Sequence, residues 1–87
     1  MAVKDNGTFK GKVAFVTGAA NGIGRATAIA FATEGANVAV ADISEKGIQE
    51  TVRLIEEAGG KALAITCDVQ KSEDIKKALD ETVKTFG

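Results

Sequence analysis

A short apolar run followed at once by closely spaced glycines is the feature that most constrains how this chain folds. Val13–Thr17 carries no charge and is rich in β-branched residues, which is typical of a strand buried on both faces of a sheet. Gly18, Gly22 and Gly24 follow before a helical pattern begins. Glycine tolerates positive φ, lets a ligand touch the main chain and lets a helix lie close to a strand. The chain is therefore expected to turn from strand to helix within a few residues.

The same strand-helix unit recurs along the chain. We predict strands over 13–17, 37–42 and 61–67, a helix over 22–34, and further helices capped by Ser44 and Ser72. The predicted buried positions are Ile23, Ala26, Thr27, Ala30 and Phe31 in the first helix and Ile75, Ala78, Leu79, Thr82, Val83 and Phe86 in the third. This alternation predicts an α/β fold, half of a Rossmann doubly wound parallel sheet with strand order 3-2-1. We expect residues 1–87 to form one nucleotide-binding half, with residues 1–10 flexible.

Charge and composition argue against several classes of partner. The formal net charge is −1 and the charged residues are interspersed, so no basic stripe predicts binding to nucleic acid or to an anionic membrane. No apolar run approaches the ~20 residues that span a bilayer, and the start of the chain lacks the apolar segment of a signal peptide. Cys67 is the single cysteine and cannot form an internal disulfide. We therefore expect a cytoplasmic chain with no metal site, no nucleic-acid partner and no membrane partner.

The glycine turn and an acid after the second strand predict a dinucleotide site. The first helix directs its unpaired N–H groups into the turn, where a phosphate is the natural occupant. Asp42 lies at the end of the second strand, where its carboxylate can accept hydrogen bonds from both hydroxyls of an adenosine ribose and would repel a 2′-phosphate. We therefore predict NAD(H) over NADP(H). Arg25 counts against this preference, because a guanidinium there could reach a 2′-phosphate. Asp42 could instead serve only the start of the helix that Ser44 caps.

The stretch Thr17-Gly18-Ala19-Ala20-Asn21-Gly22-Ile23-Gly24 resembles the cofactor loop of the short-chain dehydrogenase/reductase family. The resemblance extends to Asp42 after the second strand and to Asp68-Val69 after the third, and it covers the N-terminal, cofactor-binding portion of such an enzyme. It implies a hydride-transferring oxidoreductase in which Asp68 and Val69 line the adenine. The expected cofactor-binding residues are Thr17, Gly18, Asn21, Gly22, Ile23, Gly24, Asp42, Ile43, Asp68 and Val69.

The catalytic residues that the resemblance implies are absent from this sequence. The family uses a Tyr-x-x-x-Lys pair with a serine and an asparagine, whereas this chain contains no tyrosine and no histidine. No general acid can be named among its residues, so we assign no catalytic residue. We expect these residues alone to show no dehydrogenase turnover.

Two other functions remain compatible with the sequence. The chain could be a free-standing nucleotide-binding half-domain that repairs its open edge by pairing strand Val13–Thr17 with the same strand of a second copy. It could also be a fragment of a methyltransferase that binds S-adenosylmethionine, since those domains place glycines and acids at similar strand ends. The glycine spacing and Thr17, where that family tends to have an acid, count against the methyltransferase. A Walker phosphate loop is excluded, because Arg25 and Ala26 follow the last glycine in place of Lys and Ser or Thr.

Overall fold

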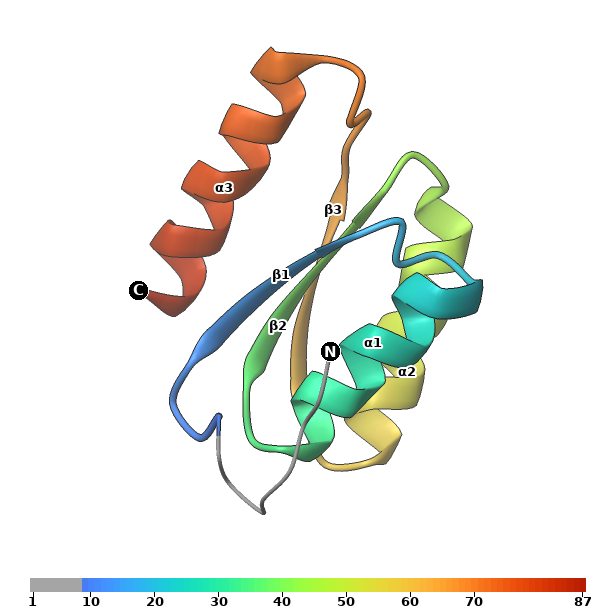
Figure 1. Ribbon diagram of the computed structural model, residues 1–87, viewed down its shortest axis with the longest axis vertical. Coiled ribbons are helices and arrows are strands. Elements are labelled where there is room, and N and C mark those ends of the chain that lie inside the picture. The colour runs from blue at the N-terminus through green and yellow to red at the C-terminus, as the bar shows by residue number, and fades with distance from the viewer. Residues whose placement is uncertain (1–8) are drawn as a thin grey trace.

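A computed structural model describes residues 9–87. Along the chain it contains β1 (Val13–Thr17), α1 (Gly22–Thr33), β2 (Asn37–Asp42), α2 (Glu45–Glu57), β3 (Lys61–Thr66) and α3 (Ser72–Phe86) (Figure 1). The predicted alternation of strands and helices is confirmed. Two boundaries are wrong by one residue, because α1 ends at Thr33 and β3 ends at Thr66. Of the segment 1–10 that we predict to be flexible, residues 1–8 lie outside the described residues.

The strands form one parallel sheet with β2 in the middle, which confirms the predicted order 3-2-1. Val13 pairs with Asn37 and Asn37 pairs with Lys61, so the strands start in register. Their carboxyl ends consequently lie together at one edge of the sheet, from which the connections to all three helices leave. β1 is an edge strand, as predicted.

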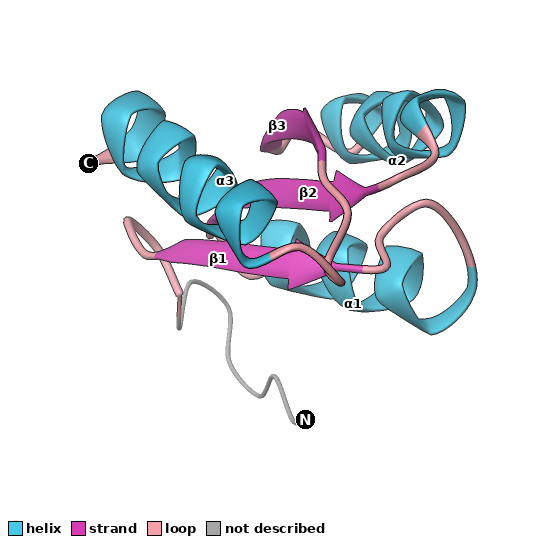
Figure 2. Ribbon diagram, turned by 90° about the horizontal axis from the view of Figure 1, so that it is seen from above, coloured by secondary structure: helices cyan, strands magenta, loops and turns pink. Residues whose placement is uncertain are grey.

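Helices cover both faces of this sheet. Figures 1 and 2 show α1 and α2 side by side on one face and α3 on the other. Because neighbouring strand residues point to opposite faces, each face has its own core. The larger core lies under α1 and α2 and includes Val16, Ala28, Val38, Val40, Ile48 and Ile55. The smaller one lies under α3 and contains Ala41, Cys67 and Ala78. β2 is therefore buried from both sides.

The predicted buried face of α1 is wrong in part. Ala28 and Ala32 are the buried residues of this helix, whereas Ile23 is 86% exposed and Ala26 is also exposed. The close contact between α1 and the end of β1 is made by Gly24, so its neighbour Ile23 is directed into solvent. The small residues of α1 allow this helix to approach the sheet closely.

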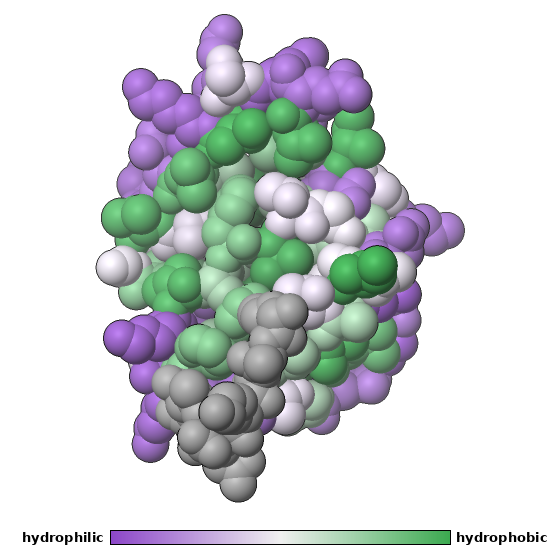
Figure 3. Space-filling view, viewed as in Figure 1, coloured by the Kyte–Doolittle hydropathy of each residue, from purple (hydrophilic) through white to green (hydrophobic). Residues whose placement is uncertain are grey.

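α3 also differs from the prediction at two places. Its N-cap is Lys71, not Ser72, and no side chain caps it. Ala78 and Thr82 are buried, but Leu79 and Val83 are 44% and 64% exposed. Among the described helices α3 is alone on its face of the sheet, so no neighbour covers its flank. Figure 3 shows the resulting apolar surface on the side of the molecule where α3 lies.

Candidate functional site

The glycine turn between β1 and α1 is built by backbone conformation and by close approach. Gly18 and Gly22 adopt positive φ angles of 64° and 57°, a region that L side chains disfavour. A Cβ atom on Gly24 would lie 1.9 Å from the carbonyl oxygen of Gly18. Glycine is therefore required at position 24 for α1 to begin so close to the end of β1.

The N-terminus of α1 is left open by its own residues. Its N-cap, Asn21, has an extended backbone and makes no side-chain capping bond, and no acidic residue lies in the first turn. Gly22 and Ile23 are exposed. The first N–H groups of a helix have no intrahelical acceptor, so this end presents free donors and the positive end of the helix dipole to solvent.

Asp42 joins the end of β2 to the glycine turn. Its Oδ2 accepts a hydrogen bond of 3.2 Å from the Ala20 N–H, and its Oδ1 accepts one of 3.0 Å from the Ser44 N–H. The second bond supports the alternative role in which Asp42 serves the start of α2. The carboxylate is only partly buried, and each oxygen keeps a second lone pair. Asp42 can therefore organise the main chain and still accept bonds from a ligand.

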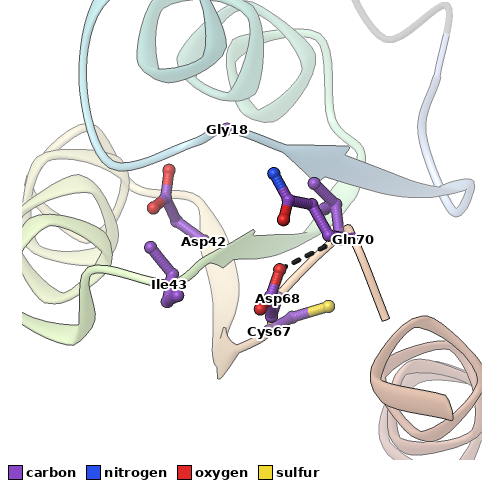
Figure 4. Close-up of a pocket in the computed structure, with 7 residues that line it drawn as sticks. Gly18, Asp42, Ile43, Cys67, Asp68 and Gln70 are labelled. Carbon is purple, nitrogen blue, oxygen red and sulfur yellow. Dashed lines mark hydrogen bonds between the residues drawn. The ribbon is translucent and has the colours of Figure 1, made fainter. Parts of the chain in front are cut away.

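The carboxyl ends of the strands surround a hollow of about 270 Å³ (Figure 4). It is lined by Gly18, Asp42, Ile43, Cys67, Asp68, Val69 and Gln70. Asp68 accepts a hydrogen bond of 2.9 Å from the Gln70 N–H, and its own N–H donates to Asp74 at 3.1 Å. Ile43 and Val69 are 68% and 49% exposed. The hollow thus offers two carboxylates and two exposed apolar side chains.

The structure brings together five of the ten predicted cofactor-binding residues around this hollow: Gly18, Asp42, Ile43, Asp68 and Val69. The other five, Thr17, Asn21, Gly22, Ile23 and Gly24, belong to the end of β1, the turn and the first turn of α1. Gln70 was missed by the sequence reasoning. Its only signal is that it follows Asp68 by two residues, the spacing of a turn in which an aspartate binds a main-chain N–H.

Cys67 lies in the wall of the hollow without the environment of a reactive thiol. It is 2% exposed, and burial, with smaller effects of Asp74 and Asp68, raises the pKa of its thiol. A thiol whose pKa is raised is a poor nucleophile at neutral pH. Cys67 is therefore a small buried residue of the core under α3.

Residues 9–87 contain neither a cluster of metal ligands nor a membrane-spanning helix. No group of three or more His, Cys, Asp or Glu side chains in this range could hold a metal ion. None of the helices there is long and apolar enough to cross a membrane.

Comparisons with known proteins agree with this geometry. The family model described as short chain dehydrogenase matches residues 12–87. An uncharacterized oxidoreductase of Thermotoga maritima is 49% identical over 79 residues, 91% of this chain and 31% of that protein. Cyclohexanol dehydrogenase of Acinetobacter sp. is 43% identical over 79 residues, 91% of this chain and 32% of that protein.

The crystal structure of a hydroxysteroid dehydrogenase from Escherichia coli superimposes with a TM-score of 0.89 at 38% identity, covering 91% of this chain and 32% of that chain. The chain therefore spans about a third of the length of the relatives it matches. Sequence, fold and strand-end geometry agree that the chain belongs to the short chain dehydrogenase family of oxidoreductases, as its cofactor-binding N-terminal part.

Proposed function

We propose that this chain binds NAD(H) for a short-chain dehydrogenase/reductase that transfers hydride between the nicotinamide and an alcohol or carbonyl substrate. The observation that carries the proposal is the position of Asp42. Its carboxylate lines the hollow beside Gly18 and is bonded to the turn that leads into the open end of α1. An adenosine ribose and the adjoining pyrophosphate need these two features next to each other.

The pyrophosphate is assigned to the turn from Gly18 to Gly24. The free N–H groups of the first turn of α1 suit an anion, and no acidic side chain in that turn competes with it. Asn21 is at the N-cap with its side chain free of a capping bond. Ile23 and its neighbours present main-chain N–H groups at an exposed surface, where a phosphate can approach.

The preference for NAD(H) rests on Asp42 and on the direction of Arg25. Asp42 offers the 2′- and 3′-hydroxyls a charged acceptor, and the same charge repels a 2′-phosphate. Arg25 does not supply the compensating cation, because its guanidinium donates to Thr51 and to two main-chain carbonyls. These bonds direct the Arg25 guanidinium toward α2, which supports the proposed preference for NAD(H).

The adenine is assigned to the hollow between the ends of β2 and β3. Ile43 and Val69 expose apolar surface there that a ring can cover. Asp68 keeps acceptor capacity beyond its bond to the Gln70 N–H, so it can accept from the exocyclic amine.

The described half supplies binding and no proton transfer. Because the chain lacks the tyrosine of the Tyr-x-x-x-Lys pair that the resemblance implies, we expect the general acid for hydride transfer to come from residues of a longer protein. We expect the isolated 87-residue chain to show no alcohol oxidation. An Asp42-dependent oxidation by the purified chain would contradict this.

The test is a titration of NADH, with NADPH in parallel, followed by cofactor fluorescence, to which a chain without tryptophan adds little background. We expect saturable binding of NADH and weaker binding of NADPH. Asp42→Ala should weaken NADH binding about 10- to 100-fold, because a charge-assisted hydrogen bond contributes ~1.5–3 kcal/mol, and should reduce the preference over NADPH.

The matched control is Asp80→Ala, which removes an exposed acid of α3 away from the hollow and should leave both affinities unchanged. S-adenosylmethionine, the ligand of the methyltransferase alternative, should not compete with NADH. An unchanged ratio of the two cofactor affinities in Asp42→Ala would refute the assignment of Asp42.

A second candidate function is self-association through β1. Among the described residues this strand pairs only with β2, and Val13 on it is 40% exposed. Such an edge can pair with the same edge of a second copy around a two-fold axis. We expect sedimentation equilibrium to show a dimer that Val13→Lys dissociates, because a lysine on an edge strand opposes pairing. A monomeric mass at high protein concentration would exclude this dimer.

A further inference from the structure

The two residues after Gly18 have every main-chain polar group paired within the protein. The Ala19 N–H donates to the Ala41 carbonyl at 3.2 Å, and its carbonyl accepts from the Thr51 hydroxyl at 2.6 Å. The Ala20 N–H donates to Asp42, and its carbonyl accepts from Arg25. Ala19 and Ala20 are 0% and 3% exposed, so these bonds are made away from solvent. This pair is therefore the fixed part of the glycine turn.

Arg25 connects that fixed part to α2. Its Nε donates to Thr51 Oγ1 at 2.9 Å, and one terminal nitrogen donates to the carbonyls of Ala20 and Gly47, the latter at 3.2 Å. Thr51 is fully buried, and its hydroxyl donates a hydrogen bond to the Ala19 carbonyl. The planar guanidinium thus bonds two segments that lie more than 20 residues apart in the sequence.

Gly47 allows this contact to be direct. A Cβ atom on Gly47 would lie 2.5 Å from the Cβ of Ala20, which is closer than packed carbon atoms approach. α2 therefore lies against the turn itself, with only the methyl group of Ala20 between their main chains. The turn is held on this side by Arg25 and Thr51, and on the other side by Asp42.

We propose that Arg25 and Thr51 are positioning residues that hold Ala19-Ala20 in the conformation in which the turn accepts a dinucleotide. The N–H and the carbonyl of Ala20 are fixed by Asp42 and Arg25, so the turn and the ribose-binding carboxylate are oriented together. Loss of Arg25 leaves the Ala20 carbonyl without this donor and lets Ala20 move. Asp42, which is bonded to the Ala20 N–H, then moves with Ala20. The ligand in this inference rests on the proposed function, whereas the fixation of the turn does not.

The first measurement is hydrogen exchange by NMR on the ligand-free chain. Arg25→Lys should increase the exchange rate of the Ala20 N–H about tenfold or more relative to amides in the middle of α2, because an ammonium cannot reproduce a planar, multi-acceptor bond pattern. Arg53→Lys, at an exposed position of α2, is the matched control and should leave the Ala20 rate unchanged. An unchanged Ala20 rate in Arg25→Lys would overturn the inference, whether or not NADH binds.

The second measurement is the affinity for NADH and NADPH. Arg25→Lys should weaken both about tenfold by the same factor, since Arg25 acts through the turn. A larger loss for NADPH would mean that Arg25 contacts the 2′-phosphate and would overturn the inference.

Thr51→Val should weaken NADH binding, whereas Thr51→Ser, which keeps the hydroxyl, should bind NADH as the unmodified chain does. Equal NADH affinities of these two variants would also contradict the inference. Absence of NADH binding in the unmodified chain would refute the proposed function, while the exchange experiment would still decide the role of Arg25.

Discussion

α1 and α2 each follow a strand of the same parallel sheet, yet only α2 has a side-chain cap for the N–H groups of its first turn. Ser44 caps α2 by accepting from the Gly47 N–H at 3.2 Å, and Glu45 adds a negative charge to the first turn. α1 begins at Asn21 with no side-chain cap and no acid. Because Asp42 bonds to Ala20 and to Ser44, one carboxylate touches both helix starts.

Under the proposed function, this difference reserves the N-terminus of α1 for the pyrophosphate. A helix end that is completed by its own residues gains stability, typically ~0.5–2 kcal/mol for the cap. α1 lacks this stabilising cap, and its first turn also contains Gly24, which close packing against the end of β1 requires. α3 resembles α2 in having acids, Glu73 and Asp74, in its first turn. Of the described helices, α1 is thus the one with neither a side-chain cap nor an acid in its first turn.

The largest effect is expected from Gly24→Ala. The added methyl group would meet the Gly18 carbonyl oxygen at 1.9 Å, so α1 would have to move away from β1. Overpacking costs ~1–3 kcal/mol or more, and against backbone we expect at least the upper figure. Urea unfolding should show this loss, and NADH binding should disappear.

Gly22→Ala is the matched control for that substitution. Gly22 also has a positive φ of 57°, but a Cβ there would have nothing within 4 Å. Its cost should be only the conformational ~1 kcal/mol. If the two variants lost equal stability, close approach would not be the reason for glycine at position 24, and α1 would not need to start so near β1.

The fold could be predicted because its causes are local. β-branched runs, glycines and capping residues recur in order, and parallel strands joined by helices leave few possible topologies. The position of Asp42 follows from this topology, since the carboxyl ends of parallel strands meet at one edge. The predicted buried face of α1 is wrong in part, because the many alanines of this helix give little contrast between its faces and do not distinguish Ala28 and Ala32 from Ala26 and Ala30.

What the sequence did not reveal depends on contacts between distant segments. Its place in the sequence allows Arg25 to face the ligand as a cation, whereas in the structure its guanidinium bonds to Thr51, 26 residues away. The exposure of Leu79 and Val83 likewise depends on which elements cover α3, and that is not encoded in the spacing of α3 itself. Local patterns define elements and their ends, but the direction of a long polar side chain is set by its tertiary partners.

Asn21→Asp sharpens the comparison by giving α1 the kind of end that α2 has. A carboxylate at the N-cap interacts favourably with the helix dipole, so the ligand-free chain should gain ~0.3–1 kcal/mol in urea unfolding. The same charge would lie next to the pyrophosphate and should weaken NADH binding about tenfold at low salt, and less at high salt. Asn21→Ser, a neutral capping residue, is the control. Tighter binding by Asn21→Asp would mean that the anion is not held at this helix end.

Ser44→Ala tests the other side of the comparison and should have the smallest effect on function. It removes the side-chain oxygen that accepts from the Gly47 N–H, so unfolding by urea should show a loss of ~1 kcal/mol. The Ser44 main chain still donates to Asp42, which keeps the carboxylate in place, so NADH affinity should stay within about twofold. Ser44→Thr should retain the cap and the stability. A large loss of NADH affinity in Ser44→Ala would mean that the N-terminus of α2 also takes part in holding the cofactor. The proposed difference in role between the N-termini of α1 and α2 would then be wrong.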